Sequence, residues 1–147
     1  MNKIIMIICC VIMDFGLIFG EVQETYTQEE IDLIARIVMN EAGYSSIDEK
    51  QLVAETILNR VDSDLFPDTV KDVIYQPGQF YTLYVREPDD NCYIAVRNAI
   101  TYRAFPRDML YFRNDHVDYG YFYTQFPGSK LVFSTLNDYN NLGGDHE

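Results

Sequence analysis

Apolar residues recur every three or four positions between residues 27 and 42, which predicts an amphipathic helix. These positions are Ile31, Ile34, Ala35, Val38 and Ala42. Thr27 and Glu30 stand three residues apart at the start of the stretch, as in a capping box, in which each side chain bonds the other's backbone N–H. Gly43 interrupts the pattern, so we expect the helix to end there.

The same spacing predicts a second helix that begins at Ser46 and runs to about Val61. Ser46 and Glu49 repeat the capping-box pattern at its start. The apolar stripe of this helix is expected to be its buried face. It comprises Val53, Ala54, Ile57, Leu58 and Val61.

Two further helices are predicted, a short one opened by Pro67 and Asp68 and a longer one that begins at Asp89 or Asp90 and is closed by Pro106. Their inward positions are Val70, Val73, Ile74, Val96, Ala99 and Ile100. After residue 107 the pattern changes to β-rich stretches at 109–112, 119–123 and 130–134. Helices followed by a small antiparallel sheet predict an α+β domain over residues 21–136, with a polar, frayed tail at 137–147.

Residues 1–20 have the features of a signal peptide. Lys3 gives a basic start, Ile4–Met13 is an unbroken apolar run, and Gly20 offers a small residue for cleavage. An uncleaved anchor is the alternative, although the apolar stretch is short for a membrane span. A buried N-terminal helix or strand is a third interpretation. We expect a secreted or cell-wall-associated protein.

Composition narrows the range of partners. The net charge of −12 argues against nucleic acid and anionic membranes, and we expect no membrane contact beyond the signal segment and a monomeric state. Of three cysteines, only Cys92 lies beyond the signal segment, so no disulfide framework is possible, and we interpret Cys92 as a core residue on a helix.

Glu41 is the candidate catalytic residue. It follows Ile34 by seven positions and therefore lies above it on the apolar face of the first helix, at its last turn. A carboxyl group among apolar side chains stays protonated closer to neutral pH, as a general acid for glycosidic cleavage requires. The alternative is an ordinary glutamate at a helix end that points to water.

A glycosidase with two carboxyl groups would need a partner for Glu41. The candidates are Asp48, Glu49, Glu55, Asp62 and Asp64. None is compelling: Glu49 is a cap, Asp62 and Asp64 end a helix, and Glu55 lies beside the apolar stripe, a position compatible with exposure to solvent. If Glu41 is catalytic, it works alone.

The loop at residues 76–80 offers groups for sugar recognition. Gln76 and Gln79 can exchange hydrogen bonds with hydroxyl or acetamido groups, and Tyr75, Phe80 or Tyr81 can stack on a ring. The alternative is a plain turn anchored by a buried Phe80. His116 lies among acids at 113–118, but without a second histidine at ligand spacing we expect a loop beside a cleft and no metal. No motif for a cofactor is present.

Five short motifs, in this order and spacing, resemble the cell-wall hydrolase family typified by the spore cortex-lytic enzyme SleB. The motifs are Ala35–Gly43, Val53–Val61, Phe66–Val70, Val73–Phe80 and Pro106–Asn114. The resemblance covers about residues 28–135. It implies a lysozyme-like fold with a helical body and a small sheet, and peptidoglycan glycan strands as substrate. It places the family's catalytic glutamate at Glu41, and Tyr111, Asn114 and His116 become further candidate substrate contacts.

The resemblance further implies a lytic transglycosylase, in which one carboxyl group suffices. That group protonates the glycosidic oxygen and then deprotonates the muramic acid C6 hydroxyl, which closes a 1,6-anhydro ring. The alternatives are a hydrolytic muramidase on the same fold, a non-catalytic peptidoglycan-binding relative, and a metal-dependent amidase that uses His116. The chain departs from the family at Ser45, where many members have a second glutamate, at Leu131, where a histidine is usual, and at Tyr81–Tyr84.

Overall fold

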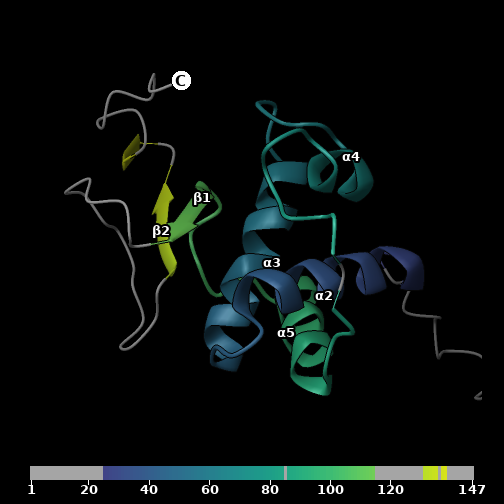
Figure 1. The fold of residues 1–147 in the computed structure, drawn as a ribbon. Coiled ribbons are helices and arrows are strands. Elements are labelled where there is room, and N and C mark those ends of the chain that lie inside the picture. The colour runs from purple at the N-terminus through teal and green to yellow at the C-terminus, as the bar shows by residue number, and fades with distance from the viewer. Residues whose placement is uncertain (1–24, 85, 115–130, 136, 139–147) are drawn as a thin grey trace, which may run out of the picture.

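A computed structural model of the chain describes residues 25–84, 86–114, 131–135 and 137–138. The described elements follow in the order α2 (Gln28–Ala42), α3 (Ile47–Val61), α4 (Val70–Ile74), α5 (Asp90–Thr101), β1 (Met109–Asn114) and β2 (Leu131–Thr135). Helices therefore precede a two-stranded antiparallel sheet, and the predicted α+β class is confirmed (Figure 1).

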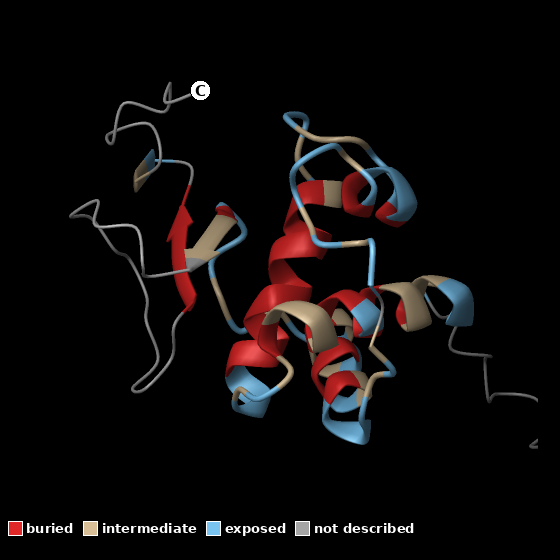
Figure 2. Ribbon diagram, viewed as in Figure 1, coloured by how far each residue is buried: buried red, intermediate tan, exposed pale blue. Residues whose placement is uncertain are grey.

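Helix α3 is the centre of the domain. It contacts α2, α4, α5 and β1, which lie around it (Figure 1). Every residue from Glu49 to Arg60 is buried, so the helix is covered on all sides and not only along its apolar stripe (Figure 2). The predicted stripe is confirmed except at Val61, which is only partly buried. The polar residues of a helix buried all round must find partners inside the protein.

The helix starts largely follow the predicted caps. Both halves of the Thr27 and Glu30 capping box form, and Ser46 Oγ accepts a hydrogen bond from Glu49 N at 3.3 Å. Asp89 caps α5 as expected. The start of α4 was predicted too early, because Thr69, and not Pro67 or Asp68, accepts the hydrogen bond from the first turn.

The end of α5 was also misplaced. The helix stops at Thr101, five residues before Pro106, because Tyr102 is already extended, with φ −148° and ψ 137°. Pro106 therefore does not close it. Buried polar side chains of α3 bond the backbone of the segment 104–110 instead. These hydrogen bonds satisfy the backbone groups of the segment in a non-helical conformation. The local sequence does not predict them.

Strands β1 and β2 pair antiparallel, with Phe112 opposite Phe133 and an irregularity between Met109 and Tyr111. The rings of Phe112 and Phe133 lie 5.6 Å apart between centroids, and Phe133 is fully buried. The sheet thus closes one side of the helical core. The predicted strand at 119–123, the signal segment 1–20 and most of the tail 137–147 lie outside the described residues.

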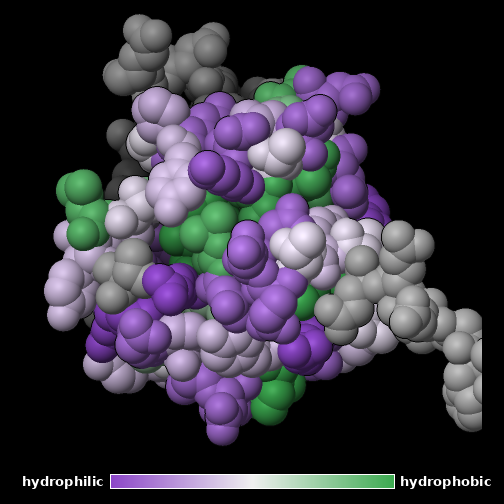
Figure 3. Space-filling view, turned by 90° about the vertical axis from the view of Figure 1, so that its right-hand side faces the viewer, coloured by the Kyte–Doolittle hydropathy of each residue, from purple (hydrophilic) through white to green (hydrophobic). Residues whose placement is uncertain are grey.

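The face turned to the right in Figure 1 is mainly hydrophilic, with hydrophobic residues gathered near its middle (Figure 3). Within the described ranges, no helix has the length and apolar character that a bilayer span requires. Cys92 is fully buried, which confirms its predicted place in the core, and its Sγ lies 3.8 Å from Met39 Sδ.

Candidate active site

Glu41 lies in the last turn of α2 and is partly buried. Its neighbours on the helix, Val38 and Ala42, belong to the buried core. The backbone N–H of Tyr81 donates a hydrogen bond of 3.2 Å to Glu41 Oε1. The carboxyl group therefore lies at the edge of the core, where α2 meets the segment after residue 80.

Burial raises the pKa of Glu41 above its ordinary value, because the surrounding protein solvates the carboxylate less well than water does. The hydrogen bond from Tyr81 N stabilises the carboxylate and lowers the pKa in part. The partial negative charge at a helix C-terminus disfavours a second negative charge and acts in the same direction as burial. The result is an acid whose proton is held more tightly than that of an exposed glutamate.

Lys50 and Gly43 fix the end of α2. The buried Lys50 Nζ, from α3, donates hydrogen bonds to Gly43 O at 2.7 Å and Ser45 O at 3.4 Å, although α2 has no basic residue in its own last turn. A Cβ atom at Gly43 would stand 2.5 Å from the carbonyl oxygen of Met39, so only glycine allows this close turn. Both features hold the backbone on which Glu41 is carried.

Asn40 joins the end of α2 to the segment 81–86. Its Nδ2 donates to Tyr81 O at 3.0 Å, and its Oδ1 accepts from Arg86 N at 3.1 Å. Arg86 in turn donates to the hydroxyl of Tyr44 at 2.6 Å and lies over its ring at 4.9 Å. Sequence reasoning did not assign Asn40 a role, and its position beside Glu41 in the first motif was the only available signal.

Arg60 is a second residue that sequence reasoning missed. It brings together three of the predicted substrate contacts: its Nη1 donates to Gln79 Oε1 at 2.9 Å, and its guanidinium lies 5.1 Å from the Phe80 ring and 5.9 Å from the Tyr111 ring. Burial lowers the pKa of Arg60 to about 10. Its position in the second motif gave no hint of these contacts, since an arginine at a helix end usually points to solvent.

The other predicted contacts differ in their surroundings. Tyr75 is 56% exposed, whereas Phe80 is partly buried and packs on the core, which favours the alternative of an anchor. Gln76 Oε1 is buried and has no hydrogen-bond partner among the residues that the structure describes. Asn114 ends β1, and His116 lies outside the described residues.

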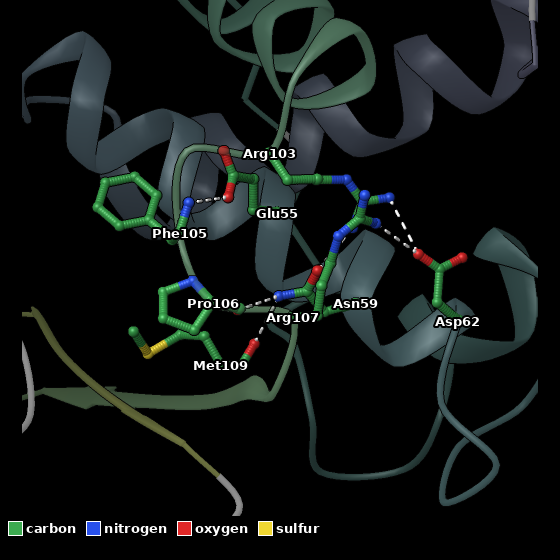
Figure 4. A network of polar contacts seen from close by, with 8 residues as sticks. All are labelled: Glu55, Asn59, Asp62, Arg103, Phe105, Pro106, Arg107 and Met109. Atoms are coloured by element: carbon green, nitrogen blue, oxygen red, sulfur yellow. Dashed lines mark hydrogen bonds and ion pairs between the residues drawn. The ribbon is translucent and has the colours of Figure 1, made fainter.

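Glu55 corrects an expectation. The sequence was compatible with an exposed Glu55, yet the residue is 0% exposed. Its carboxylate accepts three hydrogen bonds, from Gln51 Nε2 at 2.7 Å and from the backbone N–H groups of Ala104 and Phe105 at 2.9 Å each. Figure 4 shows the bond from Phe105. This carboxylate holds the segment before β1 against α3 and has no free face for chemistry.

Asp62 is also engaged elsewhere. It forms ion pairs with Arg103 at 3.3 Å and Arg107 at 3.2 Å, and Arg103 donates to Asn59 Oδ1 at 2.6 Å (Figure 4).

An open groove of about 390 Å³ adjoins this network, and Glu41 is not among the residues that line it. The lining residues are Asn59, Asp62, Ser63, Arg107, Asp108 and Leu110. Over the described part of the chain, no three histidine, cysteine or acidic side chains come together as a metal site would require.

Residues 44–133 match the sequence model of a family described as Cell Wall Hydrolase. The match begins three residues after Glu41. A spore cortex-lytic enzyme of Oceanobacillus iheyensis is 35% identical over 109 residues, which are 71% of this chain and 40% of that enzyme. A spore cortex-lytic enzyme of Bacillus subtilis is 31% identical over 97 residues, 60% of this chain and 30% of that enzyme. The chain thus spans less than half the length of these relatives.

Two solved structures are similar in fold. The catalytic domain of the Bacillus anthracis germination-specific lytic transglycosylase SleB has a TM-score of 0.60 at 29% identity, over 76% of this chain and 98% of that chain. The catalytic domain of Bacillus cereus SleB has a TM-score of 0.56 at 28% identity, over 74% and 91%. The predicted lysozyme-like fold is confirmed by this likeness.

Proposed function

Because the chain belongs to the cell wall hydrolase family, we propose that it cleaves the glycan strands of peptidoglycan with Glu41 as the acid and base. The observation that supports this most directly is the environment of Glu41, a partly buried carboxyl group with a raised pKa. Such a group keeps a proton available for a leaving oxygen at a pH where an exposed glutamate has lost it.

The proposed reaction is lytic transglycosylation. Glu41 donates its proton to the glycosidic oxygen as the bond to the anomeric carbon breaks. The resulting carboxylate then takes the proton of the muramic acid C6 hydroxyl, whose oxygen bonds to the anomeric carbon and closes the 1,6-anhydro ring. The protons balance without water, and the N–H of Tyr81 stabilises the carboxylate between the two steps.

The state of the other acids favours a mechanism with one carboxyl group. The Glu55 carboxylate accepts three internal hydrogen bonds, and Asp62 is paired with two arginines. The fully buried Glu55 is therefore not available to activate a water molecule or to attack the anomeric carbon, as the second carboxyl group of a hydrolytic muramidase would, and the ion pairs of Asp62 compete with such a role.

For substrate binding we propose the segment 75–80, β1 and the loop after it. Gln76, which is partly exposed, can exchange a hydrogen bond with a sugar hydroxyl or an acetamido group, and the exposed ring of Tyr75 can stack on a pyranose face. Gln79, Tyr111, Asn114 and His116 complete the proposed set, and Phe80, which packs on the core, anchors the segment. Secretion through residues 1–20 and a monomeric state stay predictions.

The test is digestion of purified peptidoglycan by the full chain, with the soluble products analysed by mass spectrometry. We expect 1,6-anhydro products and a loss of activity in Glu41→Gln of about 10²-fold or more. Glu29→Gln, in the exposed first turn of the same helix, is the matched control and should keep full activity.

Other products would select another function. Products heavier by one water molecule at the muramic acid end would indicate a hydrolytic muramidase. Release of stem peptides, inhibited by a chelator, would indicate an amidase. Binding to peptidoglycan without any product would indicate a non-catalytic relative, and equal activity in Glu41→Gln would remove Glu41 from the mechanism.

A further inference from the structure

Arg60 is a buried cation whose described partners are all neutral. Only 3% of the residue is exposed. Its Nε donates to Leu110 O at 2.8 Å, its Nη1 donates to Gln79 Oε1, and the Phe66 ring lies 4.9 Å from the guanidinium carbon. No carboxylate of the described residues lies within ion-pair distance of the Arg60 guanidinium. Burial of a charge without a nearby opposite charge is costly. The burial of Arg60 is therefore better explained by the segments that it holds in place than by a contribution of its own to stability.

The guanidinium holds two chain segments at once. Through Leu110 O it fixes the start of β1, and through the Gln79 side chain and the Phe80 ring it fixes the end of the segment 76–80. The Phe80 ring also lies 5.9 Å from Phe112 of β1, which completes the contact between the two segments. A planar group with several N–H donors can make these contacts together, and a lysine ammonium cannot.

The peptide unit that follows Phe80 connects this arrangement to Glu41. The N–H that bonds Glu41 Oε1 belongs to Tyr81, and its orientation is set by the carbonyl carbon of Phe80, to which that nitrogen is covalently joined. Displacement of Phe80 would therefore turn or withdraw the one described hydrogen-bond donor of the candidate acid.

We propose that Arg60 is a positioning residue for Glu41, which acts by fixing Gln79 and Phe80 so that the Tyr81 N–H meets the carboxylate. Arg60 itself does not bond Glu41. The inference deepens the proposed function and rests on it, because it gives the acid of that reaction its geometry. Arg60, which belongs to the second motif, thus acts on the site indirectly, through its contacts with the segment 76–80.

A substitution of Arg60 should leave the contacts of the other charged groups near the end of α2 unchanged. Lys50, from α3, bonds Gly43 O and lies 4.0 Å from Asp89 at the start of α5. Arg86, from the segment after the loop, bonds the hydroxyl of Tyr44. None of these contacts involves Arg60 or Gln79, so a change at Arg60 alters the surroundings of Glu41 through the Tyr81 hydrogen bond.

The experiment compares Arg60→Lys with Arg103→Lys in the full chain. Arg60 bonds the start of β1 and Arg103 bonds Asn59 of α3, and both variants keep the charge, but of the two only Arg60 contacts the segment 76–80. The pKa of Glu41 is measured by ¹³C NMR of its carboxyl carbon, which is assigned by its absence in Glu41→Gln. Melting temperature and the pH profile of kcat are recorded for the same proteins.

We expect Arg60→Lys to raise the pKa of Glu41, because the carboxylate loses the Tyr81 hydrogen bond that stabilises it. The protonated acid then persists to higher pH, so the alkaline limb of kcat moves to higher pH as well. At the optimum, kcat should fall on the order of 10²-fold from misplacement of the acid. Arg103→Lys should lower the melting temperature and leave both the pKa and the limb unchanged.

An unchanged Glu41 pKa in a folded Arg60→Lys would overturn the proposal and leave Arg60 a structural residue. If Arg60→Lys does not fold, the double variant Gln79→Ala and Phe80→Leu decides, because it removes the contacts of Arg60 with the loop and leaves Leu110 O bonded. The NMR titration does not depend on turnover. A failure of the proposed function, seen as activity in Glu41→Gln, is thus distinguishable from a failure of the positioning role.

Discussion

Glu41 and Glu55 are two glutamates on adjacent helices that differ in their burial and in their hydrogen bonds. Glu55 is fully buried and accepts three hydrogen bonds of 2.7–2.9 Å. Glu41 is only partly buried, and its one described hydrogen bond is longer, at 3.2 Å. The more deeply buried carboxylate is therefore the better satisfied one.

The difference shows that burial alone does not make a catalytic acid. A buried carboxylate with a full set of donors is a structural element, because removing it strands those donors. A partly buried carboxylate with one donor keeps a raised pKa and an open side from which substrate can approach. This contrast between the two glutamates can be tested by the same substitution at both.

The largest effect is expected for Glu55→Ala against Glu41→Ala. Glu55→Ala leaves the buried Gln51 Nε2 without its partner and removes the acceptor of two partly buried backbone N–H groups, which should lower the free energy of unfolding by about 4 kcal/mol. Glu41→Ala removes a carboxylate that is poorly solvated and should leave stability nearly unchanged while activity is lost. Denaturant unfolding at neutral pH measures both, and a similar loss in the two variants would contradict the assignment of roles.

A smaller effect is expected for Gly43→Ala. The new methyl group would meet the Met39 carbonyl oxygen at 2.5 Å, and since this atom is backbone, the last turn of α2 must shift. We expect a loss of about 1–3 kcal/mol in unfolding free energy. Activity should fall as well, because the same turn carries Glu41.

Gly78→Ala is the matched control for that prediction. A Cβ at Gly78 meets no atom within 4 Å, although its φ of 77° adds backbone strain. Gly78→Ala should therefore lower stability without displacing the end of α2. If Gly43→Ala kept the pH profile and the kcat of the wild-type protein, the close turn at Gly43 would have no influence on Glu41.

The smallest effect is a dependence of stability on pH through Glu41. Its pKa is raised on folding, so the native state binds the proton more tightly than the unfolded chain does. This contribution to stability is complete below the unfolded value of about 4.5 and is lost as pH rises through the folded pKa. The difference in unfolding free energy between wild type and Glu41→Gln should therefore decrease across that window, and an increase would show that Glu41 is stabilised as the carboxylate.

Much of the local structure was determined by the sequence itself. The capping residues Thr27, Ser46 and Asp89 and the apolar spacing were enough to place three of the four described helices, because caps and periodicity act within a few residues. Glu41 could be singled out for the same reason, since its place above Ile34 follows from helix geometry alone. The two described strands also lie where the β-rich stretches predicted them.

Only the tertiary structure decided what the polar residues of α3 do. Glu55, Asn59 and Arg60 bond backbone and side-chain groups between 19 and 50 residues away, and no local pattern encodes such partners. Glu55 was therefore mistaken for a candidate surface residue, and Arg60 was overlooked. In both cases the energy lies in contacts between segments distant along the chain, which exist only once α3 is enclosed on every side.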